Sequence, residues 1–235
     1  MTVISFFNTS LALTQAQFNE LLRLLPTSLQ TKVLRFRREE DARASLFGKL
    51  LLQKMIEHFG FTASLEDLEY TKYERPYIHI SDHELFDFNI SHSGHYVVCA
   101  ASTDMRLGID IEKKSPIDSV DFISQFTSAE WQQIKSSSDS TSEFYRFWTR
   151  KEALAKADGR GLNFPFNQID LAGDRVMVPL EDKQWHLKPI SLSNHYECVL
   201  ATGQPADSLS LFELQYMAGL EGAFQLKLNT VEQNS

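Results

Sequence analysis

A plan of helix followed by short strands occurs twice along the 235-residue chain, and it constrains the fold more than any other feature. In each half, segments with apolar residues at helical spacing precede short apolar or alternating runs that favour strands. One stretch also repeats, because residues 91–101 read SHSGHYVVCAA and residues 191–201 read SLSNHYECVLA. We therefore predict an α+β fold of two similar halves, a pseudodimer, in which each half is a helix packed on a small, mostly antiparallel sheet. A cleft is expected where the halves meet.

The first half, residues 1–105, is predicted to begin with a strand at Val3–Phe7. Helical spacing then starts at Thr14 and lasts to Pro26, and it resumes from Leu29 to Gly60 as one long helix or as two helices with a break near residues 39–41. Strand-like runs follow at residues 68–73, 77–80, 87–90, 96–101 and 107–112.

The second half, residues 106–228, is predicted to contain a short helix starting at Ser128 and a longer helix from about Ser142 to Ala157 that stops at Gly159. The Ser-rich segment at residues 136–142 favours a solvated loop. Strands are predicted at residues 168–171, 176–178, 185–189, 196–201 and 210–214. Residues 229–235 are predicted to form a disordered tail.

Composition excludes several classes of protein. The 23 Lys and Arg against 31 Asp and Glu give a net charge of −8, whereas a nucleic-acid or membrane-surface binder needs a basic face. An apolar content of 43% is enough for a core. No run approaches the roughly 18 apolar residues of a membrane helix and no signal peptide is evident, so we expect a cytoplasmic protein. Cys99 and Cys198 lie in apolar runs and are expected to be buried, reduced thiols.

The first candidate for chemistry is the segment Leu107-Gly108-Ile109-Asp110-Ile111-Glu112. Alternate residues of a strand share a face, so Asp110 and Glu112 lie together opposite the two isoleucines, with Cα atoms about 7 Å apart. Two such carboxylates suit a hard cation such as Mg²⁺, which takes a few protein oxygens and fills its other positions with water and phosphate. An ordinary half-buried strand with a polar outer face explains the same pattern.

The second candidate lies on the helix predicted to contain Phe147–Lys156. Glu152 and Lys156 are four residues apart and therefore share a helix face, and Lys151 is adjacent to Glu152. A surface ion pair worth about 0.3–0.5 kcal/mol accounts for this spacing. A third metal-binding carboxylate beside an ammonium that contacts phosphate oxygen accounts for it as well.

The third candidate is the strand and turn at Phe88–Gly94, which leaves His92 and free backbone N–H groups where a phosphate could bind. A Ser–His nucleophile pair is disfavoured, because sequence neighbours rarely adopt that geometry and no nucleophile elbow surrounds Ser91. Basic residues near the first long helix provide either a solvated face or a phosphate clamp. These basic residues are Lys32, Arg35, Arg37, Arg38 and Arg43.

Three motifs occur in a fixed order along the chain. They are Asn89-Ile90-Ser91-His92-Ser93, Gly108-Ile109-Asp110-Ile111-Glu112, and Trp148-Thr149-Arg150-Lys151-Glu152-Ala153 with Lys156, Gly159, Gly161 and Leu162. Their order and spacing resemble the Sfp-type 4′-phosphopantetheinyl transferases. The likeness extends to residues 40–46 and to Arg75-Pro76, and it covers about Leu25 to Pro165. The family fold, a pseudodimer of two similar α+β halves, agrees with the repeated stretch.

The resemblance implies transfer of the 4′-phosphopantetheine arm of coenzyme A to a serine of an apo acyl, peptidyl or polyketide carrier protein, releasing 3′,5′-ADP. This is the activity of a holo-[acyl-carrier-protein] synthase. By that likeness Asp110, Glu112 and Glu152 hold Mg²⁺ with the pyrophosphate. The residues implied to bind coenzyme A are Lys32, Arg43, Ser45, Arg75, Ser91, His92, Lys151 and Lys156.

Within this implied site, Lys156 and Glu152 are the expected catalytic residues. Lys156 contacts the pyrophosphate, and Glu152 takes the proton of the carrier serine, with Glu112 or a metal-bound water as alternatives. Two positions depart from the family. Arg75 replaces a frequent Lys, and a second Lys one helical turn before Lys32 is here Leu29, so the phosphate clamp has one cation fewer.

The remaining expectations concern partners. We expect the carrier to dock on Phe122–Trp131, through Phe126 and Trp131 as exposed aromatic residues. The chain is expected to act as a monomer, because the family's seam already lies within it, and to bind neither nucleic acid nor membrane. The alternative to a transferase is a catalytically idle coenzyme A-binding regulator on the same fold.

Overall fold

The structure is a computed structural model that describes residues 1–11, 13–81, 85–171, 175–178, 183–218 and 224–231. The first half contains β1 (Thr2–Asn8), α1 (Gln15–Leu22), α2 (Thr27–Leu34), α3 (Glu39–His58), β2 (Leu68–Tyr70), β3 (Pro76–Ile78), β4 (Asp87–Ser93) and β5 (Tyr96–Ser102). The second half contains β6 (Leu107–Lys113), α4 (Ser128–Ser136), α5 (Ser140–Asp158), β7 (Arg175–Val178), β8 (Lys183–Pro189), β9 (Tyr196–Thr202), β10 (Leu209–Ala218) and β11 (Phe224–Thr230). None of the helices in these ranges is long and apolar enough to cross a bilayer.

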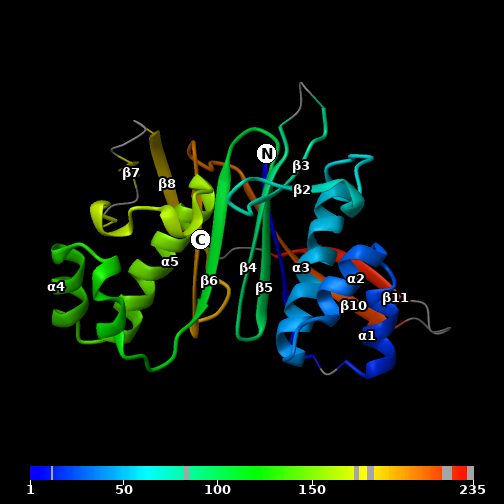
Figure 1. Ribbon diagram of the computed structural model, residues 1–235, viewed down its shortest axis with the longest axis horizontal. Coiled ribbons are helices and arrows are strands. Elements are labelled where there is room, and N and C mark those ends of the chain that lie inside the picture. Colours follow the sequence, from blue (N-terminus) through cyan, green and yellow to red (C-terminus); the bar gives the residue numbers. More distant parts are fainter. Residues whose placement is uncertain (12, 82–84, 172–174, 179–182, 219–223, 232–235) are drawn as a thin grey trace.

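The elements form two sheets between two long helices. One sheet has the strand order β11-β10-β1-β5-β4, the other has the order β6-β9-β8-β7, and β2 and β3 form a separate hairpin. Figure 1 shows α3 and α5 on opposite sides of β4, β5 and β6. The pairs are antiparallel except for the parallel pair of β1 and β10. The predicted α+β pseudodimer is confirmed.

Side chains alternate between three apolar cores. On β5, Cys99 faces α3, whereas Val98 and Ala100 face the second sheet. On β6, Ile109 and Ile111 lie in the core between the sheets, so the predicted strand parity is correct. The alternate side chains of β6, Asp110 and Glu112 among them, face α5 rather than solvent, because α5 covers that side of the sheet. Both cysteines are free and buried, as expected.

The two halves are not closed units, because β10 and β11 return to the sheet of the first half. Residues 2–6 of β1 pair with residues 209–213 of β10. The proposed boundary between residues 105 and 106 thus separates two groups of elements that share one sheet. The tail predicted from Asn229 is wrong at its start, because Asn229 and Thr230 belong to β11, and residues 232–235 lie outside the described residues.

Other differences are local. The predicted break at residues 39–41 lies at residues 35–38, and α3 starts at Glu39. The Ser-rich loop is shorter than predicted, because α5 starts at Ser140. Residues 168–171 do not form a strand, since their polar backbone groups bond to buried side chains. Lys151 Nζ donates to the Ile169 carbonyl at 3.1 Å, and Leu171 N donates to Glu130 at 3.0 Å.

The strand β6 lies at a sheet edge, and side chains of β4 bond its free N–H groups. Alternate side chains of β4 accept hydrogen bonds from alternate backbone N–H groups of β6. The bonds are Leu107 N to Asp87 Oδ2 (2.8 Å), Ile109 N to Asn89 Oδ1 (3.0 Å), Ile111 N to Ser91 Oγ (3.3 Å) and Lys113 N to Ser93 Oγ (3.0 Å). We call this set the inter-sheet ladder. It fixes the register of β6 against β4 and satisfies an otherwise open edge.

Gly108 allows α5 to lie directly on β6. A Cβ atom at this position would lie 2.3 Å from the carbonyl oxygen of Ala153 and 2.3 Å from the amide nitrogen of Ala157. Both are backbone atoms of α5 that cannot move aside independently. The absence of a side chain at Gly108 therefore sets the distance between the β6 carboxylates and the α5 side chains.

We predict that Gly108→Ala lowers the free energy of unfolding by about 3 kcal/mol or more, because the new methyl group overlaps helix backbone. Urea denaturation measures the change. Gly203→Ala is the matched control, since its Cβ would meet nothing nearer than 3.8 Å. Equal stability of the two variants would contradict the proposed contact.

Candidate active site

A pocket of about 260 Å³ lies at the seam between the halves, where β4 meets β6 and α5. The first half contributes residues from β4, and the second half contributes residues from β6 and α5. The lining residues are Ile90, Ser91, His92, Asp110, Glu112, Trp148, Glu152 and Lys156. The structure thus brings the three sequence motifs together at one place.

Defined ends hold α5 in position above the pocket. Asp139 precedes the helix and accepts a hydrogen bond from Ser142 N at 2.9 Å. Gly159 ends it with φ of 88°, a left-handed conformation that glycine adopts at low cost. Between these ends, Glu152 and Lys156 are one turn apart and face β6 across Gly108.

Asp110 is the most buried acidic group of the pocket, with its side chain 4% exposed. Its Oδ1 atom accepts from Lys156 Nζ at 2.6 Å and from Ser91 Oγ at 2.9 Å. Its Oδ2 atom is buried without a hydrogen-bond partner. An unpartnered buried carboxylate oxygen is costly, so this atom is suited to receive a cation.

Glu112 lies one strand repeat further along the same face. It accepts from Ser93 Oγ at 2.9 Å and from the side chain of Trp148. Ser91 and Ser93 therefore each do two things: they accept a β6 amide in the inter-sheet ladder and donate to the carboxylate beside it. The ladder orients both acidic side chains toward α5.

The electrostatics of the pocket are dominated by crowded negative charge. Burial, followed by the charge of Asp110, raises the pKa of Glu152 from 4.5 to about 7. The same causes, in the same order, raise the pKa of Glu112. Desolvation and the positive charge of Lys156 lower the pKa of His92. The charged forms of Glu112 and Glu152 are thus disfavoured, and a bound cation would reduce this electrostatic cost.

Within the described ranges, no three acidic, histidine or cysteine side chains already converge as a complete metal-binding cluster. Asp110, Glu112 and Glu152 instead line one pocket and interact through their charges. Carboxylates of this kind are the ligands that Mg²⁺ prefers, and Mg²⁺ usually takes only one or two from a protein.

Comparison with known proteins agrees with this site. A profile described as "4′-phosphopantetheinyl transferase, N-terminal" matches residues 12–104, and one described as "4′-phosphopantetheinyl transferase superfamily" matches residues 106–204. The 4′-phosphopantetheinyl transferase gsp of Aneurinibacillus migulanus is 32% identical over 83% of this chain and 80% of its own length. The chain belongs to the 4′-phosphopantetheinyl transferase family.

Two further relatives come from a bacterium and an animal. The transferase Sfp of Bacillus subtilis is 28% identical over 82% of this chain and 88% of its own length. The L-aminoadipate-semialdehyde dehydrogenase-phosphopantetheinyl transferase of Xenopus laevis is 29% identical over 81% and 72%. The Sfp-type family expected from the motifs is confirmed, and the protein is a phosphopantetheinyl transferase. Nothing supports the idle regulator.

Residues expected to bind coenzyme A in this transferase lie in different places. Ser91, His92 and Lys156 line the pocket. Ser45 lies on α3 and accepts from Lys49 Nζ at 2.7 Å, and Lys32 on α2 donates to the Tyr70 hydroxyl at 3.3 Å. Neither Ser45 nor Lys32 lines the seam pocket.

Arg75 lines a second pocket, of about 300 Å³, that also contains Glu152 and Lys156, but most of its side chain is buried. Its side chain is 6% exposed, and its Nη2 atom pairs with Asp87 at 2.8 Å and donates to the Leu107 carbonyl at 2.9 Å. It also bonds to the carbonyl of Lys156. Burial lowers the pKa of Arg75, and Asp87 opposes that shift. In this structure the guanidinium connects β4, β6 and α5, and its contact with coenzyme A stays a prediction.

Lys151 lies on the side of α5 that faces away from the pocket. Its side chain is 1% exposed, and Nζ pairs with Glu130 at 2.9 Å and donates to the Phe166 carbonyl at 2.6 Å. Every donor direction of this ammonium is used inside the second core. The expectation that Lys151 assists coenzyme A binding is therefore wrong for this structure.

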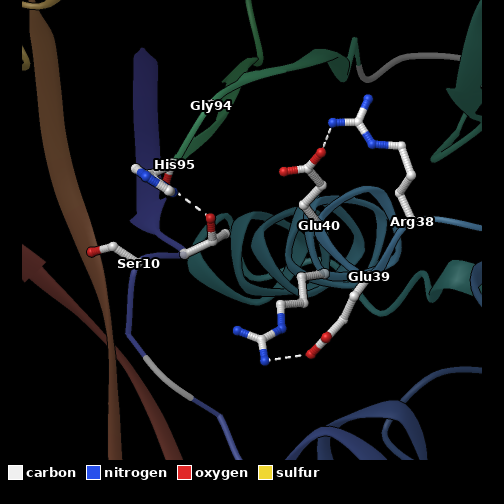
Figure 2. A pocket seen from close by; sticks show the side chains of 8 residues that line it. Ser10, Arg38, Glu39, Glu40, Gly94 and His95 are labelled. Atoms are coloured by element: carbon white, nitrogen blue, oxygen red, sulfur yellow. Dashed lines mark hydrogen bonds and ion pairs between the residues drawn. The ribbon is translucent and has the colours of Figure 1, made fainter.

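Arg43 is directed to another cavity, of about 470 Å³, beside the start of α3. Figure 2 shows Ser10, Gly94 and His95 around this cavity, with Glu39 and Glu40 in ion pairs to arginines. Arg43 pairs with Glu39 at 2.6 Å. Arg43 is therefore separate from the acidic pocket, and its predicted contact with coenzyme A finds no support in this placement.

Two contributors to the site were not singled out from the sequence. Trp148 and Ser93 lie inside the matched motifs, which was the available signal. The expected docking residue Phe126 is buried at 5% exposure, in contact with Phe144 and Trp131, so it cannot serve as an exposed anchor.

We predict that Lys151→Ala lowers the free energy of unfolding by about 3–5 kcal/mol, because it leaves the Glu130 carboxylate buried without a counter-charge. Denaturant titration measures this loss. The double variant Lys151→Met with Glu130→Gln should lose much less, since no buried charge remains. A Lys151→Ala protein of normal stability that binds coenzyme A weakly would restore the ligand role.

We predict that Glu152→Gln stabilises the metal-free protein at neutral pH. The pKa of Glu152 is raised from 4.5 to about 7 in the folded state, so ionisation costs stability as pH rises through this range. With allowance for solvent screening, the variant should gain about 1–2 kcal/mol at pH 8 and nothing at pH 4. Urea titrations in EDTA at several pH values measure it. Glu57→Gln, at an exposed residue of α3, is the control and should show no such pH-dependent gain.

Proposed function

We propose that the protein transfers the 4′-phosphopantetheine arm of coenzyme A to a serine of an apo carrier protein and releases 3′,5′-ADP, as a holo-[acyl-carrier-protein] synthase does. The observation that carries this proposal is the seam pocket, where three carboxylates and the Lys156 ammonium line one small space. Phosphoryl transfer needs positioning and charge neutralisation rather than covalent help from the protein. This donor set can supply both.

The site fits a magnesium ion. Asp110 Oδ2 is a buried oxygen without a partner, and the carboxylates of Glu112 and Glu152 line the same pocket. We propose that these three residues hold Mg²⁺, as hard oxygen ligands do. When bound, the ion would neutralise charge on the pyrophosphate of coenzyme A.

The chain's own residues would orient the substrate. Lys156 Nζ lies between Asp110 and Ser91, at 2.6 and 2.8 Å, and is 29% exposed toward the pocket. It is placed to donate to a pyrophosphate oxygen without leaving Asp110. His92 stands at the mouth of the same pocket and can donate to a second phosphate oxygen.

The carrier serine must lose a proton as its oxygen attacks the phosphorus. Glu152 is the proposed acceptor, because it lines the pocket beside Lys156, where the phosphate group would lie. Glu112 is the alternative on the same pocket wall. The proton then resides on a glutamate carboxyl oxygen, and the leaving group is the 5′-phosphate of 3′,5′-ADP.

The proposed partner is an apo carrier protein. One relative is named for L-aminoadipate-semialdehyde dehydrogenase and Sfp names no partner, so acyl, peptidyl, polyketide and aminoadipate-type carriers are all candidates. For docking we keep the segment Phe122–Trp131, but Ile123, 46% exposed, replaces buried Phe126 as its exposed apolar residue. A monomeric, cytoplasmic enzyme is proposed.

Mass spectrometry of an apo carrier incubated with the protein, coenzyme A and Mg²⁺ tests the function. We expect the carrier to gain the mass of the phosphopantetheine arm. Glu152→Gln and Asp110→Asn should each lower the rate by about 10²-fold or more. Glu143→Gln is a control on the same helix, because Glu143 pairs with Arg146 outside the pocket. Coenzyme A binding without modification of any carrier type would overturn the proposal.

A further inference from the structure

The last turn of α5 is held by hydrogen bonds that the mechanism above does not use. The last four carbonyl groups of a helix lack acceptor partners within it, and in α5 they belong to residues 155–158. The first is satisfied by the N–H group of Gly159, which donates to the Ala155 carbonyl at 2.9 Å. The second is satisfied from the other half of the chain, since Arg75 donates to the Lys156 carbonyl. Two carbonyls remain.

Arg106, in the segment between β5 and β6, bonds both of them. Its Nε atom donates to the Ala157 carbonyl at 2.9 Å, and its Nη2 atom donates to the Asp158 carbonyl at 3.2 Å. Its own carbonyl accepts from Gly203 N at 3.0 Å, and the next residue, Leu107, begins the inter-sheet ladder. The guanidinium therefore connects the end of α5 to the first hydrogen bond of the ladder.

Gly159 leaves the space that the guanidinium occupies. A Cβ atom at this position would lie 2.6 Å from Arg106 Nη2 and 3.1 Å from Arg75 Cδ. A side chain there would press against both arginines at the end of the helix. A cation also suits this place electrostatically, because the C-terminal end of a helix carries partial negative charge. The left-handed glycine and the two arginines thus form one cap.

Lys156 lies in the turn that this cap holds. From there its Nζ atom donates to Asp110 Oδ1 at 2.6 Å and to Ser91 Oγ at 2.8 Å. Helix ends fray more readily than helix interiors, and carbonyl groups without partners favour fraying. Movement of the last turn would displace the Lys156 ammonium from the seam pocket, whereas Glu152 lies one turn further inside the helix.

We propose that Arg106 is a positioning residue for Lys156. By capping the end of α5, it keeps the ammonium where the pyrophosphate of coenzyme A would bind. The inference rests on the proposed function and adds to it a residue outside the binding surface. Arg106 lines neither the seam pocket nor the second pocket that contains Arg75, so its effect on the substrate passes through Lys156.

Calorimetry with coenzyme A and Mg²⁺, without a carrier, tests this role. Arg106→Met should weaken coenzyme A binding about fivefold, or about 1 kcal/mol, and leave the KM for the carrier unchanged. In a Lys156→Met background, Arg106→Met should cause no further loss, because the residue acts through Lys156. Arg106→Lys keeps the charge and can donate to one carbonyl, so it should recover part of the affinity.

Asp139→Ala is the matched control, because it removes the cap at the opposite end of the same helix, where Asp139 accepts from Ser142 N at 2.9 Å. Denaturant titration should show that it destabilises the protein, and coenzyme A affinity should not change. An equal loss of affinity in Asp139→Ala and Arg106→Met would overturn the proposal, since general helix stability would then explain both. Additive losses in the Lys156→Met background, or unchanged binding by Arg106→Met, would also overturn it.

Failure of the proposed function is separable from failure of this inference. It would be seen in the wild-type protein, as an apo carrier that stays unmodified in the presence of coenzyme A and Mg²⁺.

Discussion

The inter-sheet ladder between β4 and β6 is the constraint on which the seam pocket depends. Two sheets that meet edge to edge could slide by a residue, and such a slip would move every carboxylate to the wrong face. Side chains of Asp87, Asn89, Ser91 and Ser93 prevent this, because each accepts one β6 amide at a defined position. Arg75 adds a buried connection from Asp87 to the Leu107 carbonyl. The same serines then aim Asp110 and Glu112, so register and site geometry have one cause.

Close helix contacts complete the pocket at a cost in electrostatic energy. Gly108 brings α5 onto β6, and Glu152 thereby enters the field of Asp110, which raises its pKa. Such crowding of acidic groups destabilises the empty pocket, and Lys156 offsets only part of it through Asp110. Burial of large apolar cores on both sides of the second sheet offsets this electrostatic repulsion in the folded state. Relief of this repulsion would favour binding of the proposed Mg²⁺ ion.

Residue spacing in the sequence was enough to predict the features that depend only on neighbouring residues. The alternation of Asp110 and Glu112 and the end of α5 at Gly159 required only neighbours in the sequence. The role of Lys151 was missed although helical phase held a signal, since at 3.6 residues per turn it lies about 140° from Lys156. The burial of Arg75 depends on Asp87 and Leu107, distant partners that no spacing rule supplies. The return of β10 to β1 likewise depends on tertiary pairing.

The repeated halves are similar in fold but contribute different groups to the seam pocket. The second half presents Asp110, Glu112, Glu152 and Lys156, and the first half presents Ser91 and His92. Tyr96 and Tyr196, equivalent residues of the repeated stretch, meet at the seam with ring centroids 4.8 Å apart, and His95 N donates to the Tyr196 hydroxyl. The proposed reaction needs these carboxylates and phosphate-binding groups at one place. Neither half alone provides them, so the reaction belongs at the seam.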